Sequence, residues 1–138
     1  MKQLKTEIMA LCNYATVAQD GKISIDGIFD QLIVEKFPAG IIDKFFVSTV
    51  SGEPNETYTL TLKLEKVGNG KNLLNLTTVN AKISPNGKHN WIVRLANVGF
   101  EDEGNYDFKI YNDNKEINST SLDVIRAGDN QGQTRVKN

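Results

Sequence analysis

Hydrophobic and polar residues alternate with a period of two along residues 57–65. The apolar positions in this run are Tyr58, Leu60, Leu62 and Leu64. Because successive side chains of a β-strand point to opposite faces, the pattern predicts a strand with one face in a core and the other in water. Two further sets follow the same spacing: Trp91, Val93 and Leu95, and Tyr106, Phe108 and Ile110. All three sets are expected to point into one core.

Clusters of Gly, Asn, Asp and Pro interrupt the apolar runs at short intervals along the chain. These residues supply the backbone angles that tight turns need, and the runs between them are rich in Val, Ile, Thr, Tyr and Phe, which favour strands. The pattern predicts strands at 7–18, 22–35, 43–50, 56–67, 72–82, 89–98, 105–112 and 116–125, with hairpins at 68–71 and 84–88. Such a succession of short strands is typical of a sandwich or a barrel.

Two of the predicted strands contain irregular positions. Gly27 lies inside the run 22–35, where a glycine indicates a bulge, a close approach of another backbone, or two strands joined by a kink. In the last strand Ile117 is out of phase with Leu122 and Val124, which indicates a bulge or a late start.

The length of 138 residues suits one domain with one core. We expect this domain to span residues 1–126. From Ala127 onward the chain offers little apolar surface to bury, so residues 127–138 are predicted to be a tail that is flexible or bound to a partner.

The segment 93–108 carries the most specific motif of the chain, Asp102-x-Gly104-x-Tyr106. It resembles the stretch that joins strands E and F of immunoglobulin domains. The resemblance implies a structural corner formed by these three residues, in which Tyr106 packs its ring into the core and bonds its hydroxyl to the backbone upstream.

The chain departs from immunoglobulin domains at the disulfide. Phe108 occupies the place of the second bridging cysteine, and Trp91 precedes the E-like strand, so it is not the usual core tryptophan. A ring at Phe108 can fill the volume of the bridge with apolar contacts. The expected fold is therefore an all-β, immunoglobulin-like antiparallel β-sandwich of about 7–9 strands with no disulfide.

The first third of the chain has a second resemblance. The matching residues are Leu11-Cys-Asn-Tyr-Ala15, Gly21-Lys22, Ile25-Asp-Gly-Ile-Phe-Asp30 and Phe37-Pro38-Ala39. They are similar to an uncharacterised family of small bacterial proteins. This resemblance implies a bacterial or phage source and an intracellular setting, and it implies no activity or ligand.

Charge and cysteine content exclude several classes of partner and location. Sixteen Lys and Arg against seventeen Asp and Glu give a net charge of −1, which provides no field to attract nucleic acid. No apolar stretch approaches the roughly 20 residues of a membrane helix. The apolar run 8–12 is shorter than the core of a signal peptide, and Cys12 has no second cysteine to bridge. We expect a cytoplasmic protein, with a phage-associated one as the alternative.

The residues that carry reactions and metals are sparse. Cys12 and His89 are the only cysteine and histidine, so neither a Cys/His nucleophile pair nor a zinc site with about four ligands is expected. The acidic run 101–103 suits calcium in residue type, but Asp102 already belongs to the corner motif and no second acidic loop accompanies it. We expect no catalytic residue, metal or cofactor.

Two functions remain open from the sequence. The first is a non-catalytic protein-interaction or structural module, with a protein partner or self-association. Its candidate surface is the last strand, 116–125, where the Asn-Ser-Thr-Ser stretch 118–121 specifies register weakly. The alternative is a small-molecule or carbohydrate-binding domain that uses loops at one end of the sandwich. Its candidate ligand contacts are Trp91, His89 and Tyr111, and an exposed Trp91 ring would favour it.

Overall fold

The structure, a computed structural model, describes residues 3–68 and 74–128. These residues form eleven strands and no helix. The strands are β1 (Lys5–Val17), β2 (Ile23–Phe29), β3 (Gln31–Val34), β4 (Ala39–Ile41), β5 (Lys44–Ser51), β6 (Thr57–Lys66), β7 (Leu74–Lys82), β8 (Lys88–Leu95), β9 (Val98–Phe100), β10 (Gly104–Asn112) and β11 (Lys115–Arg126). The all-β fold class expected from the sequence is confirmed.

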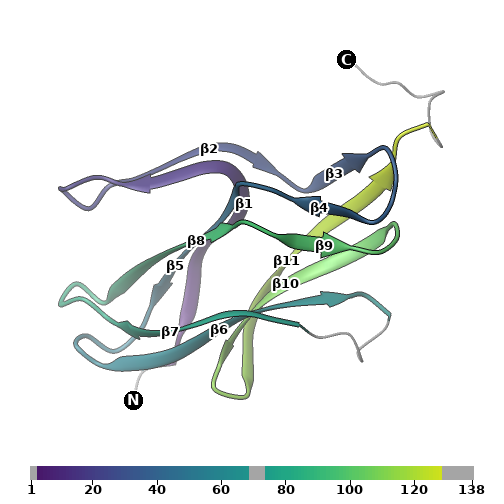
Figure 1. Cartoon of the computed structure of the whole chain (residues 1–138). Helices are drawn as coiled ribbons and strands as arrows, with labels where there is room; N and C mark the ends of the chain where they lie inside the picture. The colour runs from purple at the N-terminus through teal and green to yellow at the C-terminus, as the bar shows by residue number, and fades with distance from the viewer. Residues whose placement is uncertain (1–2, 69–73, 129–138) are drawn as a thin grey trace.

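The strands form two facing sheets and a small third one (Figure 1). Sheet A has the order β2-β1-β5-β8, sheet B has the order β3-β11-β10-β6-β7, and β4 pairs with β9. Every pairing is antiparallel except that of β3 with β11. The two larger sheets make the sandwich, and its core lies between them.

The apolar positions that the sequence places in one core do lie there. All four from the run 57–65 are buried, as are Tyr106, Phe108 and Ile110. Trp91 and Leu95 belong to the same cluster, and Val93 packs against it while partly exposed. The period of two therefore located the inner faces of β6, β8 and β10 correctly.

The structure has more strands than the seven to nine expected, because predicted runs are divided or extended and because β4, at Ala39–Ile41, lies in no predicted strand. The run 22–35 becomes β2 in sheet A and β3 in sheet B, separated by Asp30. The run 89–98 becomes β8, and the chain then continues into β9. Each division marks a place where the chain leaves one sheet for another.

One predicted hairpin is wrong and one lies outside the described residues. The turn at 84–88 exists, with the Gly87 N–H donating to the Ser84 carbonyl oxygen at 2.8 Å. The strands that it joins belong to different sheets, because β7 pairs with β6 and β8 pairs with β5. Turn residues specify that the chain reverses, but not which strands then pair. The predicted hairpin at 68–71 falls largely in 69–73, outside the described residues.

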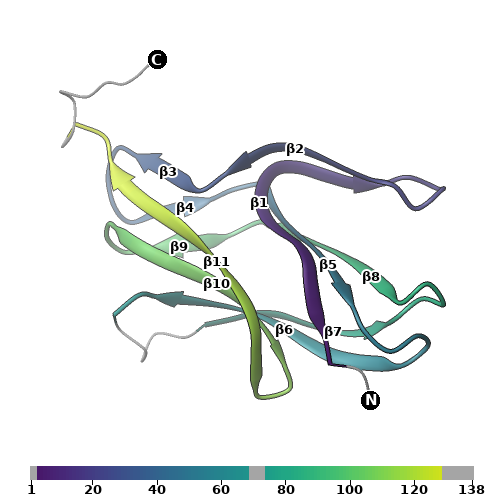
Figure 2. The ribbon, with the colours of Figure 1, turned by 180° about the vertical axis from the view of Figure 1, so that it is seen from behind.

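β1 bends sharply near its middle (Figures 1 and 2). Up to Cys12 it pairs with β5, and from Leu11 onward it pairs with β2, so its second half and β2 form an arm that extends from the rest of sheet A. At the bend Gly27 has a φ of 71° and stands beside the Asn13 side chain. The sequence indicated a bulge, a close approach of another backbone, or two strands joined by a kink. The structure shows the Asn13 side chain, not a backbone, close to Gly27, and it divides the run at Asp30.

Candidate functional site at the open edge of β11

β11 is a long strand that is paired on both sides over only a part of its length. β10 pairs with it from Lys115 to Val124. On the other side β3 pairs only with residues 123–126. Among the described residues no strand covers the far side of 115–122, so this half of β11 is an open edge of sheet B.

The position of Asp30 explains why β3 covers so little of β11. Phe29 packs against the core from β2, and Leu32 packs against it from β3, so the chain changes sheets between these two residues. The Asp123 N–H then donates to the Asp30 carbonyl oxygen at 3.0 Å, which begins the parallel pairing. Residues before Asp123 in β11 have no counterpart in β3, because β3 starts at Gln31.

The backbone groups on the open side of β11 can be assigned from two hydrogen bonds. Asp123 donates its N–H toward β3, and the Ser119 N–H donates to the side-chain oxygen of Asn118 at 2.8 Å rather than to β10. Alternate residues of a strand direct their backbone groups to the same side, so the N–H of Ser121 lies on the open side as well. This edge offers main-chain donors and acceptors to an added strand.

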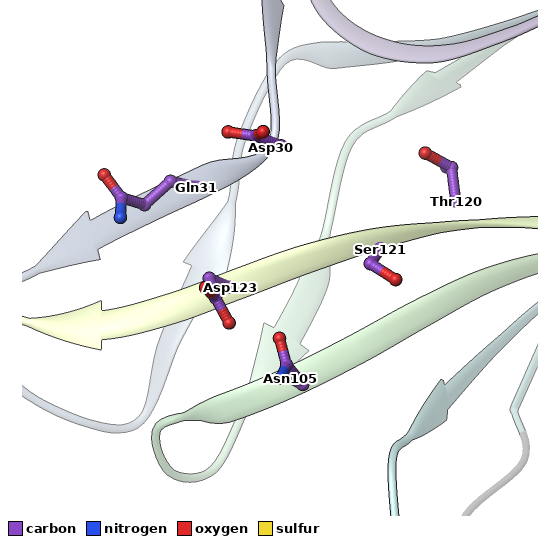
Figure 3. Close-up of a pocket in the computed structure, with 6 residues that line it drawn as sticks. All are labelled: Asp30, Gln31, Asn105, Thr120, Ser121 and Asp123. Atoms are coloured by element: carbon purple, nitrogen blue, oxygen red, sulfur yellow. The ribbon is translucent and has the colours of Figure 1, made fainter.

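A polar pocket of about 490 Å³ lies where β3 leaves β11 (Figure 3). We call it the β11 notch; its lining residues are Asp30, Gln31, Asn105, Thr120, Ser121 and Asp123. Two of these residues are carboxylates and none is Lys or Arg, so the notch has acidic character. The Ser121 hydroxyl donates to the Asp107 carboxylate at 2.8 Å, which adds a third carboxylate beside the notch.

β1 runs beside the open edge of β11 without pairing with it (Figure 2). One side-chain hydrogen bond links the two strands, from the Asn118 amide to the Thr6 hydroxyl at 2.5 Å. The open edge is therefore bordered by β3 at one end and by β1 near the other.

The motif at 102–106 lies at the start of β10, on the same end of sheet B as β3. The Tyr106 hydroxyl donates to the Asp102 carbonyl oxygen at 2.7 Å, while its ring packs edge-on against Phe100. Gly104 begins β10 and pairs with Val124 of β11. Lys66 donates to the Asp102 carboxylate at 2.5 Å. This hydrogen bond lowers the pKa of Asp102 and raises that of Lys66, while burial raises the pKa of the Tyr106 phenol.

Replacing Tyr106 with phenylalanine tests the contribution of this corner to stability. We expect the free energy of unfolding to fall by about 1–2 kcal/mol, because the Asp102 carbonyl oxygen loses its donor in a partly buried place. Urea denaturation measures the change. Tyr111→Phe on the outer face of sheet B is the control, and it should change stability by less than about 0.5 kcal/mol. Equal effects of the two substitutions would contradict a corner role for Tyr106.

A smaller pocket of about 270 Å³ lies beside this corner, lined by Phe37, Asp102, Glu103 and Arg126. The guanidinium of Arg126 stands over the Phe37 ring at 5.6 Å, and its backbone N–H donates to the Glu103 carboxylate at 3.2 Å. Each charged side chain of this pocket thus has a contact of its own, since Asp102 pairs with Lys66, Glu103 accepts from a backbone N–H and Arg126 lies over an aromatic ring.

The structure does not bring the candidate ligand contacts of the sequence together. Trp91 is 5% exposed and packs edge-on against Phe46 in the core, which is the placement expected of a core residue. His89 lies two residues before it on β8, with Nδ1 3.2 Å from the Lys82 carbonyl oxygen. Tyr111 pairs with Thr61 on β6, in the other sheet, and carries Lys63 over its ring at 4.2 Å.

The candidates for chemistry are also apart. Cys12 is buried on β1, where burial raises the pKa of its thiol, and β5 separates that strand from the strand of His89. In the described part of the chain no three His, Cys, Asp or Glu residues gather as metal ligands. Nor does a helix long and apolar enough to cross a bilayer occur in those residues.

Sequence reasoning identified part of the notch and missed the rest. Thr120 and Ser121 fall within the polar stretch 118–121 of the predicted edge. Asp30, Gln31, Asn105 and Asp123 carried no signal, since each is an ordinary polar residue within or beside a predicted strand. The parallel pairing of β3 with β11 brings Asp30 and Gln31 to Asp123, and the pairing of β10 with β11 brings Asn105 there.

Two facing sheets without a disulfide, with the last strand paired to an early one, define an immunoglobulin-like β-sandwich. A family model described as a family of unknown function, DUF6941, matches residues 7–125, and the chain belongs to this family. The match extends well beyond the first third on which the sequence resemblance to an uncharacterised family rested.

Comparison with solved structures finds an immunoglobulin-like protein from Pseudomonas aeruginosa. Its sequence is 11% identical, the match covers 88% of this chain and 96% of that chain, and the TM-score is 0.44. No curated protein matches the chain.

Proposed function

We propose that this protein is a non-catalytic protein-interaction module that binds an extended segment of a partner along the open edge of β11. The observation that carries the proposal is the pairing of β11, which has β3 beside residues 123–126 and no strand beside 115–122 in the described structure. A partner strand that adds there continues the line of β3 and takes up the exposed backbone groups of Ser121. Main-chain hydrogen bonds then supply affinity, and the notch supplies specificity.

The chemistry of the notch favours a peptide over a sugar. Its six lining residues include no aromatic ring to stack on a pyranose face. The alternative sugar site would use Trp91, His89 and Tyr111. Trp91 and Tyr111 belong to different sheets, so they do not form one site. The acidic lining favours a partner segment that carries Lys or Arg, because opposite charges steer encounter and fix register.

Peptide selection against the full chain tests the proposal. We expect a displayed library of random peptides to yield extended sequences, often basic, whose binding slows hydrogen exchange of the amides in residues 116–122. Binders that protect β7 or β8 instead would contradict the proposed edge.

Ser121 offers a matched pair of variants for the same peptides. Ser121→Pro removes the N–H on the open side and places a ring there, whereas Ser121→Ala keeps the N–H. Both variants lose the hydroxyl bond to Asp107, so their difference reports the edge alone. We expect Ser121→Pro to weaken peptide binding by about tenfold or more, and Ser121→Ala to leave it within about twofold, as measured by fluorescence anisotropy. Equal binding by the two variants would sink the strand-addition mode.

A further inference from the structure

Strand β5, which lies between β1 and β8 in sheet A, is buried on both of its faces. Five consecutive residues, Phe46–Val50, are each at most 6% exposed. Alternation directs Phe46 and Val50 into the main core, so Val47 and Thr49 point away from it. A strand of a two-layer sandwich normally buries one face only, as β10 does with its alternation of buried and partly exposed residues. The side of sheet A that faces away from the main core is therefore also buried around β5.

We call the surface around Val47 the outer face of sheet A. Its centre is a small second cluster in which Ala10, Cys12 and Val47 are buried, with Phe45 and Ile92 partly exposed around them. The arm formed by β1 and β2 covers one part of this cluster with Ala15, Ile23 and Ile25. The arm leaves large apolar side chains uncovered at its margin: Ile8 is 40% exposed, Tyr14 is 55% exposed and Ile28, which pairs with Cys12, is 67% exposed.

The outer face of sheet B carries charged side chains where that of sheet A is apolar. Lys109 reaches Glu65 at 2.5 Å and Glu116 at 3.5 Å there, and Lys63 stands over the Tyr111 ring. The hydrogen bond from Lys109 to Glu65 raises the pKa of that lysine, so its ammonium group stays charged over the ordinary pH range. One outer face is thus suited to water and the other, with its apolar centre, is suited to a covering layer.

Charged residues border the outer face of sheet A unequally at its two ends. At the end beside the bend, Asp26 pairs with Tyr14, and Asp43 holds Arg94 at 2.7 Å. At the opposite end Lys5 and Lys88 lie on either side of Ser51, and Lys88 pairs with Glu7 at 3.5 Å. Among the described residues Asp26 has no ion-pair partner, whereas Lys5 and Lys88 at the other end share the carboxylate of Glu7. The apolar centre therefore has an acidic end and a basic end, and it is complementary to itself when it is turned end over end.

We propose that the outer face of sheet A binds the same face of a second copy of this chain, about a twofold axis that runs across the strands. Such an axis sets Asp26 of each copy near Lys5 of the other, and sets the Asp43–Arg94 pair near the Lys88–Glu7 pair. An axis along the strands would instead set Asp26 near the Asp43–Arg94 pair and Lys5 near the Lys88–Glu7 pair. Each lone charge would then meet a pair that is already compensated and would gain no opposite charge, so the charges select the former arrangement. The dimer covers Ile28 and Tyr14 and completes the interior that Val47 begins. This inference does not rest on the proposed peptide edge at β11.

Sedimentation velocity of the full chain over about 1–100 µM tests the dimer. We expect a concentration-dependent dimer in the unmodified chain and a monomer in Ile28→Lys at every concentration in that range. The matched control is Leu74→Lys on β7, because Leu74 is 54% exposed and lies outside this face. This control should dimerise like the unmodified chain. A monomeric unmodified chain, or equal effects of the two lysine substitutions, would overturn the proposal.

A charge exchange tests the orientation. Asp26→Lys and Lys5→Asp should each weaken dimerisation by about tenfold, because each homodimer then opposes two pairs of like charges. A mixture of the Asp26→Lys chain with the Lys5→Asp chain should form a heterodimer as tight as the unmodified dimer, since both contacts become attractive. Failure of the mixture to recover affinity would refute this arrangement.

The peptide site and the dimer can fail separately. Ser121→Pro should leave dimerisation unchanged, and Ile28→Lys should leave peptide binding at the β11 edge unchanged. Loss of both activities in either variant would contradict two independent surfaces.

Discussion

Replacing Phe108 with alanine is expected to lower the free energy of unfolding by about 3–5 kcal/mol, which is the range measured for deleting a buried ring. Phe108 is fully buried, and its strand is held between β6 and β11, where it pairs with Leu64 and Thr120. The neighbouring strands are fixed by their ladders and cannot collapse into the space left behind. Domains of this size are stable by about 5–15 kcal/mol, so the variant is left close to its unfolding threshold.

Guanidinium denaturation followed by tryptophan fluorescence measures this loss, because Trp91 lies in the same core. Leu74→Ala serves as the control at an exposed position and should change stability by less than about 0.5 kcal/mol. If Phe108→Ala unfolded at the same denaturant concentration as the control, the main core would not depend on this ring, and the substitution of a ring for the disulfide would lose its physical basis.

The predicted inner faces were correct because their signal is local. In the run 57–65 every second residue is apolar, and a strand can bury that pattern in only one way. The division at Asp30 had no such signal, because the residues on its two sides are equally suited to strands. Which sheet each side joins is decided by the contacts of Phe29 and Leu32 with distant parts of the core.

The notch shows the same limit more clearly. Asp123 pairs with Gln31 across more than half the length of the chain, and no local pattern encodes a parallel pairing at that separation. The polar stretch 118–121 was nevertheless visible as a weakly specified edge. The structure covers the end of that predicted strand with β3 and leaves the stretch itself open.

The burial of the outer face of sheet A could not be predicted from the sequence, for another reason. In β5 the run Phe45–Val50 contains apolar residues and small hydroxyl residues without alternation, which is the pattern of a strand with two buried faces. Such a run is equally compatible with one buried face and a tolerant outer face. Only the burial of Val47 distinguishes the two.

Replacing Gly27 with alanine is expected to lower the free energy of unfolding by about 1.5–3.5 kcal/mol, from two separate causes. The residue has a φ of 71°, which costs an L-residue with a Cβ roughly 1–2 kcal/mol. A Cβ there would also stand 2.9 Å from Asn13 Cγ and closer still to its amide nitrogen, and displacing this exposed side chain from its rotamer costs about 0.5–1.5 kcal/mol.

Gly21→Ala separates the two causes. Gly21 has a φ of 90° in the turn between β1 and β2, and nothing lies within 4 Å of the Cβ that it would gain, so this variant carries the backbone cost alone. The Gly27→Ala loss should exceed the Gly21→Ala loss by the cost of the Asn13 contact. Adding Asn13→Ala to Gly27→Ala should recover part of that difference, since the Cγ and the amide are then gone. Equal losses for the two glycines, with no recovery in the double variant, would show that the Asn13 contact does not hold the bend. The arm of β1 and β2 would then be positioned by its apolar contacts with Phe45 and Ile92.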